Sequence, residues 1–311
     1  MSLPAVLQAL EVLDSATVTG EEVAATIRAA GVTDVQVKQV VGKDGSTDFL
    51  RITVPGTEGR LAGGQAPTLG IIGRLGGIGA RPEKIGLVSD GDGAVTAVAC
   101  ALKLGRMAQK RDRLPGDVVI STHICPNART IAHPSVTMMN SPVDMATLNQ
   151  EEVRPEMEAI LSVDTTRGNR VINHRGIAIS ATVKEGWILR VAEDLLTLMQ
   201  QVTGRMPVVF PLTMQDITPY GNALFHLNSI LQPATATRAP VVGVALTAEV
   251  PVPGSATGAS QPADIELAVR FCLEVAKAFG RRQCQFHDAA EWEAILRRYG
   301  SMRLLQTPGR D

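Results

Sequence analysis

Residues 86–107, GLVSDGDGAVTAVACALKLGRM, contain the pattern that decides the fold class. A short apolar run, Leu87–Val88, is followed by an acidic turn with Asp90 and Asp92, and then by an apolar helix predicted over residues 94–107. Elsewhere, apolar runs of four to six residues again alternate with predicted helices. This alternation is typical of a mostly parallel sheet that is covered on both faces. The sequence therefore predicts a three-layer α/β/α domain with a mixed, mostly parallel sheet.

The other predicted elements extend this pattern in both directions. Strands are predicted at residues 68–72, 87–88, 118–121, 159–163, 177–182 and 241–246. Helices are predicted at residues 4–13, 19–31, 151–158, 188–203, 264–279 and 289–299. Two strand-like runs, Val35–Val41 and Phe49–Val54, flank a Lys43-Asp44-Gly45-Ser46 turn and predict a β-hairpin. We expect one domain over residues 1–311, with the helices and hairpin of residues 1–60 packed on it and a helical tail over 281–311.

Composition excludes several classes of partner. The formal net charge of −1 provides no general field that would attract nucleic acid or an anionic membrane surface. The first residues carry acids rather than a basic region, which argues against a signal peptide, and apolar runs are too short to span a membrane. We therefore expect a cytoplasmic protein that forms homo-oligomers. None of its cysteines forms a CxxC pair, so a structural zinc site is not expected.

Polar side chains follow five successive apolar runs. They are Asp90 and Asp92, His123 and Cys125, Asp164 and Thr165, the segment from Asp216 to Asn222, and the segment from Thr247 to Thr257. In open α/β sheets, ligands bind beyond the carboxyl ends of the strands. Five strand ends that present acids, hydroxyls or imidazole therefore predict one crevice built by several loops.

Several kinds of chemistry remain open for this crevice. Asp90, His123 and Asp164 are suitable ligand types for a divalent metal. The alternative for Asp92, and less so for Asp90, is that the carboxylate caps the helix that follows. Cys125 and His123 lie two residues apart, so both side chains could face one site as nucleophile and base. The alternative is that Cys125 is an inert packed thiol.

The Gly-rich segment GRLGGIGARP, residues 73–82, lacks the spacing of a nucleotide-binding loop. Its two arginines, Arg74 and Arg81, are candidates to bind a carboxylate of the substrate; a surface loop without function is the alternative. Thr165, Asp216, Tyr220 and Asn222 are further candidates for the substrate pocket.

Five segments resemble a bacterial and archaeal family catalogued as a domain of unknown function, family 1177. They are IGLVSDGDGAVTA (85–97), GDVVISTHICPNA (116–128), SVDTTRGN (162–169), MQDITPYGN (214–222) and PVVGVALTAEVPVPGSATGAS (240–260). The resemblance covers nearly the whole chain and implies no established activity.

The order of parts also resembles the zinc-dependent aminopeptidases with a co-catalytic metal pair. By this resemblance Asp90 takes the place of the bridging metal ligand and Asp164 that of the Asp ligand on a later strand. The family's early His ligand is replaced by Arg74, its terminal His by Gly254 or Ser255, and its Glu-Glu pair by His123-Ile124-Cys125. The chain therefore lacks two of the usual ligands and the usual base.

From these observations we expect a hydrolase of small molecules that acts on an amide or peptide-like bond. Asp90, Asp164 and His123 would hold at most one divalent metal per chain, zinc or manganese, with His123 as third ligand or general base. One alternative is a non-catalytic small-molecule-binding protein that has lost the metal site. The other is a metal-free enzyme that uses Cys125 and His123.

Overall fold

The computed structural model describes residues 1–74, 77–132, 138–166, 168–212, 224, 226–251 and 260–309. Its strands are β1 (Asp34–Gly42), β2 (Gly45–Val54), β3 (Leu69–Gly73), β4 (Val118–Ile124), β5 (Thr130–Ile131), β6 (Met138–Met139), β7 (Ala159–Thr166), β8 (Gly176–Ile179), β9 (Val183–Lys184), β10 (Trp187–Ile188) and β11 (Val241–Thr247). Its helices are α1 (Leu3–Leu13), α2 (Gly20–Ala29), α3 (Asp92–Gln109), α4 (Met145–Glu152), α5 (Glu193–Thr203), α6 (Pro262–Gly280) and α7 (Ala289–Tyr299), with 3-10 segments that include η2 (Ser89–Gly91) and η3 (Ser229–Thr235).

One mixed sheet organises the described chain. Its strand order is β1-β2-β4-β3-β7-β11-β9-β10, and β8 also pairs with β11. The four central strands, β4, β3, β7 and β11, are parallel to their neighbours within this group, whereas the outer pairings are antiparallel. Every residue of β3, β4 and β11 is buried, as continuous apolar runs require in a sheet covered on both faces. The predicted α/β class with a mostly parallel sheet is confirmed.

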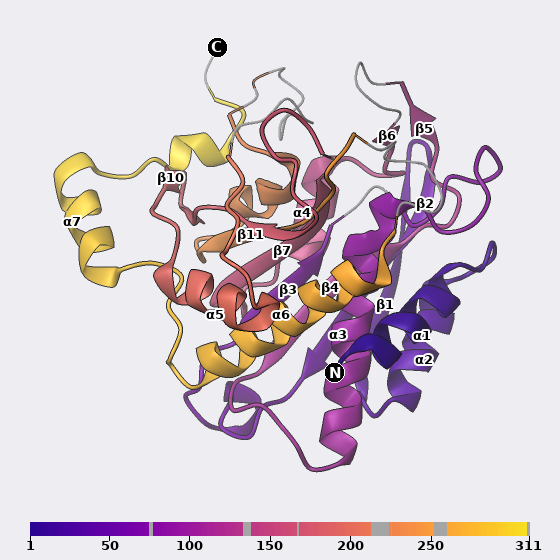
Figure 1. Ribbon diagram of the computed structural model, residues 1–311, viewed down its shortest axis with the longest axis horizontal. Helices are drawn as coiled ribbons and strands as arrows, with labels where there is room; N and C mark the ends of the chain where they lie inside the picture. Colours follow the sequence, from indigo (N-terminus) through magenta and orange to yellow (C-terminus); the bar gives the residue numbers. More distant parts are fainter. Residues whose placement is uncertain are drawn as a thin grey trace.

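The helices divide between the two faces of this sheet. Figure 1 shows α3 and α6 lying across one face, with α1 and α2 beside α3 and α5 beside α6. The other face is covered by α4 and η3, which pack on β2, β7 and β11. Helix α3 is apolar around its circumference because it is enclosed by the sheet, α1, α2 and α6. Cys100 and Cys272 are 0% exposed in this helical layer, as expected of small packed thiols.

The predicted hairpin is present and extends the sheet. Strands β1 and β2 pair antiparallel with Gly42 opposite Gly45, so that Lys43 and Asp44 form the turn. Strand β2 then pairs antiparallel with β4 along its length. We expected the hairpin to pack on the domain; instead its backbone hydrogen bonds join it to the main sheet, because β4 offers it a free edge.

Three predicted elements are wrong in position or kind. Residues 87–88 belong to no strand of the described sheet, and the N–H of Val88 donates to the carbonyl of Ile78 at 3.1 Å. The helix predicted over 151–158 is instead α4, which starts after its N-cap Asp144 and ends before Pro155, since the residue before a proline avoids helical backbone. The helix predicted from residue 188 starts at Glu193, because residues 187–188 pair with β9.

The connections define a switch point between β3 and β7. After β3 the chain crosses through α3 to β4, on one side of β3, whereas after β7 it proceeds to β11 on the opposite side. Adjacent strands whose connections diverge in this way leave a crevice at their carboxyl ends, where ligands bind in open α/β sheets. The carboxyl ends of β3 and β7 are Gly73 and Thr166.

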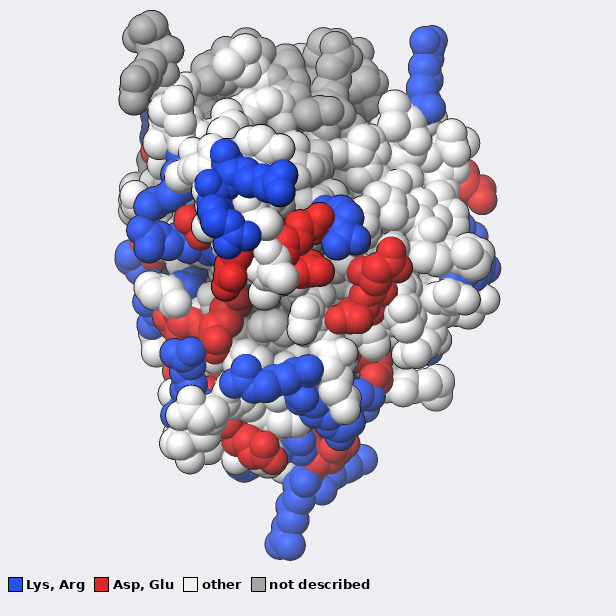
Figure 2. Space-filling view, turned by 90° about the vertical axis from the view of Figure 1, so that its left-hand side faces the viewer, with Lys and Arg blue, Asp and Glu red and all other residues white. Residues whose placement is uncertain are grey.

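The face shown in Figure 2 carries basic and acidic side chains in close alternation. Ion pairs of the described surface include those of Arg190 with Asp288 at 3.8 Å and with Glu291 at 3.0 Å. No helix among the described residues has the length and apolarity needed to cross a membrane.

Candidate functional site

Strand register aligns three candidate side chains at the switch point. Ile72 of β3 pairs with Ser121 on β4 and with Ser162 on β7. His123 lies two residues after Ser121 on β4, and Asp164 lies two residues after Ser162 on β7. Side chains two residues apart on a strand share a face, so both lie on the same face of the sheet. Arg74 follows β3 between them, and its N–H donates to the carbonyl of Val163 at 2.8 Å. The sheet therefore brings an imidazole, a guanidinium and a carboxylate into one row.

Two residues of the hairpin hold the ring of His123. Its Nδ1 lies 2.7 Å from the Oγ1 of Thr47, and its ring stacks on Phe49 with centroids 5.3 Å apart. The Thr47 hydroxyl donates its one proton to the carbonyl of Ile124 at 3.1 Å. Thr47 must therefore accept from Nδ1–H, which makes Nε2 the acceptor nitrogen of the neutral ring. His123 is fully buried, so its ring is fixed before any ligand arrives.

Segment η2 brings Asp90 to the same edge of the sheet. The Thr165 hydroxyl donates to the carbonyl of Ser89 at 2.8 Å, which ties the end of β7 to η2. Helix α3 starts so close to this edge that a Cβ on Gly93 would lie 2.6 Å from the Arg74 carbonyl oxygen and 2.7 Å from that of Val163. Only a glycine fits this approach, and it fixes where Asp90 stands relative to Asp164.

Asp92 does not cap α3. No side-chain cap is present at the start of this helix, and one carboxylate oxygen of Asp92 accepts a hydrogen bond from the hydroxyl of Ser260 at 2.5 Å. Asp92 therefore links the start of α3 to the chain that leads into α6. We predicted that Thr165 binds substrate. Its hydroxyl instead donates its hydrogen bond within the protein, to the carbonyl of Ser89.

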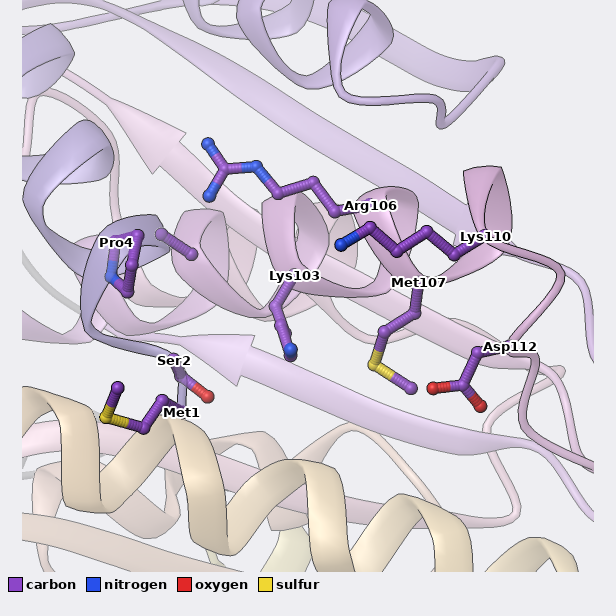
Figure 3. Close-up of a pocket in the computed structure, with 9 residues that line it drawn as sticks. Met1, Ser2, Pro4, Lys103, Arg106, Met107, Lys110 and Asp112 are labelled. Atoms are coloured by element: carbon purple, nitrogen blue, oxygen red, sulfur yellow. The ribbon is translucent and has the colours of Figure 1, made fainter.

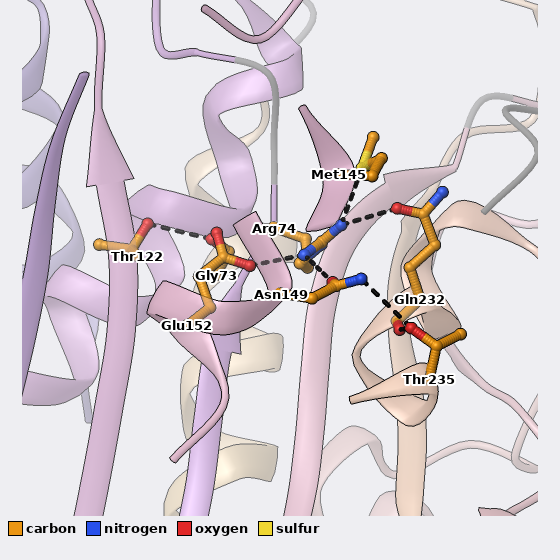
Figure 4. Close-up of polar contacts among 8 residues, drawn as sticks. All are labelled: Gly73, Arg74, Thr122, Met145, Asn149, Glu152, Gln232 and Thr235. Carbon is orange, nitrogen blue, oxygen red and sulfur yellow. Dashed lines mark hydrogen bonds and ion pairs between the residues drawn. The ribbon is translucent and has the colours of Figure 1, made fainter. Parts of the chain in front are cut away.

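Arg74 is the centre of a buried polar network on the α4 and η3 side of the sheet (Figure 4). Its guanidinium forms an ion pair with Glu152 at 2.6 Å. It also donates to Asn149 at 3.0 Å and to Gln232 at 2.8 Å. Asn149 in turn donates to Thr235 at 3.2 Å. We predicted that Arg74 binds a carboxylate of the substrate; in the structure it binds an internal carboxylate.

The network leaves some of its polar atoms without partners. Glu152 Oε1 and Gln232 Nε2 are buried and make no hydrogen bond within the described part of the chain, and the same holds for the hydroxyls of Ser121 and Ser162. Burial is the main influence on Glu152 and raises the pKa of its carboxyl, while Arg74 opposes this rise. Burying this ion pair therefore carries a large desolvation free energy, and removing one residue would leave the other as a buried charge without its partner.

Arg81 also has internal partners. Its guanidinium donates to the backbone carbonyls of Pro126 at 3.2 Å and Asp14 at 2.6 Å, and one nitrogen lies 4.0 Å from the Asp14 carboxylate. These contacts tie the loop after β3 to the end of α1. The prediction that Arg81 binds a substrate carboxylate finds no support in this arrangement.

Cys125 has the environment of an inert thiol. It is 2% exposed and packs in an apolar cluster with Ala80, Val88, Ala128 and Met139. Burial raises the pKa of its thiol, which keeps the sulfur protonated, whereas a nucleophile needs the thiolate. We predicted Cys125 as a catalytic candidate; the structure supports the alternative, a packed residue.

The predicted metal site of Asp90, His123 and Asp164 is not formed as a three-ligand group. Among the described residues, no three His, Cys, Asp or Glu side chains are grouped closely enough to hold a metal ion. His123 and Asp164 stand two strands apart, and the cationic residue Arg74 follows the strand between them, where a metal site would need a donor. Donors to one zinc ion must each lie about 2 Å from it.

Three predicted pocket residues, Asp216, Tyr220 and Asn222, lie outside the described residues, as do Gly254 and Ser255. Sequence reasoning missed Thr47, Phe49, Glu152, Asn149 and Gln232. Phe49 opens a predicted strand, but Thr47 lies before the start of that prediction and joins the same face only because β2 begins at Gly45. Glu152 was assigned to the first turn of a misplaced helix, and no sequence signal identified Gln232 as a partner of Arg74.

The fold is an α/β protein with a mixed, mostly parallel sheet, and a row of polar side chains stands at its switch point, at the carboxyl ends of the central strands. The chain belongs to the DUF1177 family, described as a protein of unknown function, whose profile matches residues 38–309. No curated protein matches the sequence.

Solved structures with the same fold include two enzymes. The bottromycin maturation enzyme BotP superposes with a TM-score of 0.53 and 16% sequence identity, over 90% of this chain and 70% of that one. The glutaminyl cyclase of an Acidobacteriales bacterium superposes with a TM-score of 0.53 and 12% identity, over 90% of this chain and 94% of that one. At these identities the likeness concerns the fold.

Proposed function

We propose that the protein is an enzyme that hydrolyses an amide or peptide-like bond of a small molecule in the crevice at the carboxyl ends of β3, β4 and β7. One observation carries this proposal: strand register sets His123, Arg74 and Asp164 side by side at the topological switch point. Ligands of open α/β sheets bind at such points. That two proteins of the same fold are named a maturation enzyme and a glutaminyl cyclase is consistent with it.

In this proposal His123 is the general base. Its hydrogen bond to Thr47 leaves Nε2 as the proton acceptor, and its stacking on Phe49 holds the ring at the site. A base positioned in this way takes a proton from the attacking water. Asp164 and Asp90 supply carboxylates beside the crevice, where they can accept hydrogen bonds from an N–H group of the substrate.

No step of this chemistry is assigned to a metal. An aminopeptidase-like fold implies a divalent ion, but the described donors do not fit one, because no three of them are grouped. Arg74, which occupies the place of a ligand in those enzymes, carries a positive charge and is paired with Glu152. Substrate carboxylate recognition is also not assigned to Arg74 or Arg81, because both have internal partners.

A second candidate function is that of a non-catalytic small-molecule-binding protein. The observation that favours it is the same ungrouped donor set among the described residues, on a sheet that keeps its topological switch point. The third reading, a Cys125 and His123 enzyme, is disfavoured by the raised thiol pKa.

A panel of aminoacyl and peptidyl 7-amido-4-methylcoumarin substrates, tested with and without a chelator, distinguishes these readings. We expect turnover by the wild type, a 10²- to 10⁴-fold loss in H123A, and a loss in D164N. The matched controls are H174A and D34N, which change the same residue types away from the row. Turnover that persists in both H123A and D164N would contradict the proposal. Saturable binding of panel members without turnover would support the binding protein, and full loss of turnover with chelator would restore a metal to the mechanism.

A further inference from the structure

A hollow lies at the far end of α3 from the candidate site. It has a volume of about 270 Å³ and is lined by residues at the start of α1 and by Lys103, Arg106, Met107, Lys110 and Asp112 from the end of α3 and just beyond it. Helix α3 rises about 1.5 Å per residue, so Lys103 lies roughly 17 Å along the axis from Asp92 at the crevice. The hollow is therefore a separate feature, between the start of α1 and the last turns of α3.

Three cations of this hollow come from successive turns of one helix. Lys103, Arg106 and Lys110 are spaced at i, i+3 and i+7, which places them along one side of α3. In Figure 3, Lys103 and Met107 lie between Ser2 and Asp112, with the amino group of Lys110 above them. Asp112 is the one carboxylate side chain of the lining, so the charged lining side chains have a net charge of two positive.

The cations of this hollow have no close carboxylate partner in the described part of the chain. Among the described residues, none of the three takes part in an ion pair, and Arg106 donates instead to the neutral amide of Gln8 on α1. Another hollow, of about 300 Å³ between α5 and α7, differs in this respect. Its Arg190 forms ion pairs with Asp288 and Glu291, which line the same hollow. The helix dipole does not explain why a cation stands at Lys103. It stabilises positive charge only within the last turn, and α3 continues to Gln109.

The position of the hollow is fixed by contacts on both sides. The N–H of Ser2 donates to Glu266 of α6 at 3.0 Å, which holds the start of α1 in place. The Arg106 guanidinium is held by its bond to Gln8. Pro4, Ala5 and Met107 supply apolar surface beside the cations. A partly apolar wall with a preset cationic side suits a ligand that has both an anionic and an apolar part.

We propose that this hollow binds a small organic phosphate. A phosphate monoester carries a charge of about −1.5 to −2 at pH 7, which complements the net charge of the lining. Arginine and lysine are the usual protein partners of phosphate oxygens. The small volume favours a phosphate with a compact organic group, which would contact Met107 and Pro4.

Phenyl phosphate is the probe that tests this proposal, by isothermal titration calorimetry on the whole chain at low salt. We expect saturable binding to one site, weaker affinity as salt is raised, and at least a tenfold loss in K103Q/K110Q. The matched control is K43Q, an exposed lysine in the β1–β2 turn. Circular dichroism and urea unfolding check the fold, and K110E replaces the double variant if that variant is unfolded.

Three outcomes would overturn the proposal: no saturable binding, unchanged affinity in the variants of Lys103 and Lys110, or an equal loss in K43Q. Equal affinity for inorganic phosphate and phenyl phosphate would overturn the assignment of an organic ligand. Because the hollow is distant from His123 and Asp164, H123A should bind phenyl phosphate like the wild type. This last measurement separates the hollow from the proposed catalytic crevice.

Discussion

Replacing Glu152 by alanine should remove the counter-charge of the buried Arg74 and destabilise the protein strongly. The side chains of Arg74 and Glu152 are 4% and 0% exposed, and the ion pair is 2.6 Å long. Removing one partner of such a pair leaves an uncompensated buried charge, which costs about 3–5 kcal/mol. Because the free energy of unfolding of a typical domain is about 5–15 kcal/mol, this loss would be a large part of the total.

Three further variants separate the charge from its environment. E152Q keeps the size and one acceptor of the side chain, so its loss should be smaller, about 1–3 kcal/mol. The double variant R74M/E152L removes both charges and should cost less than E152A alone, because no buried charge remains. E274A breaks an exposed helical ion pair with Lys277 and should cost less than about 0.5 kcal/mol.

The assay is urea unfolding followed by circular dichroism, with the free energy extrapolated linearly to water. A loss in E152A as small as that in E274A would refute the reasoning. So would a double variant whose cost equals the sum of R74M and E152L measured singly, since the two residues would then be uncoupled.

The pH dependence of the same variants gives an independent check. Burial raises the pKa of Glu152, so the folded state binds this proton more tightly than the unfolded chain does. The stability that this carboxyl contributes is fully present below the ordinary Glu pKa, about 4.3, and is lost as the pH rises through the raised value. The stability of the wild type relative to E152Q should therefore fall as the pH is raised. A difference that grows with pH would contradict the direction of the shift.

Four other predictions follow from single contacts. T47V should lower kcat and change KM little on any substrate that the panel identifies, because it removes the partner that orients the His123 ring; an unchanged kcat would oppose this role. D144A should cost about 0.5–2 kcal/mol in urea unfolding, since Asp144 accepts from the Thr147 N–H at 2.8 Å, and its lowered pKa means that this contribution is lost as the pH falls. G93A should destabilise by about 1–3 kcal/mol or more, because its Cβ meets two backbone oxygens; wild-type stability would show that α3 can shift. Cys125 should react with a thiol reagent only after unfolding, as mass spectrometry of native and denatured samples can show.

Much of the fold was predictable because the central strands are continuous apolar runs. The runs ending at Ser121, Val163 and Leu246 all belong to one sheet, whereas Leu87–Val88 is too short to compete with its turn for backbone partners. The helix misplaced at residues 151–158 shows the limit of acidic patterning: Asp144, seven residues before that predicted start, supplies the actual cap. Local helix propensity does not reveal which of two possible helix N-termini the tertiary structure uses.

The candidate site was predictable only in part. Polar residues after buried strands indicated the correct edge of the sheet, because parallel strands share a carboxyl end. Their partners could not be inferred, since Thr47 and Glu152 reach the site from segments distant in sequence. Two cationic side chains, Arg74 and Arg81, were interpreted as ligand-binding groups when each has internal partners. Cytoplasmic location and homo-oligomer formation stay predictions.

The pairing of the hairpin strand β2 with β4 limits how far the chain can be truncated from its N-terminal side. A chain begun at residue 38, where the family match begins, would cut β1 in half and discard α1 and α2. The amide and carbonyl groups of β2 from Leu50 to Thr53 would then lie at an open sheet edge, a recognised route to aggregation. The apolar side of α3 that packs on α1 would also face water. Expression of the matched segment alone should therefore yield insoluble protein, while the first 37 residues act as an intramolecular cover.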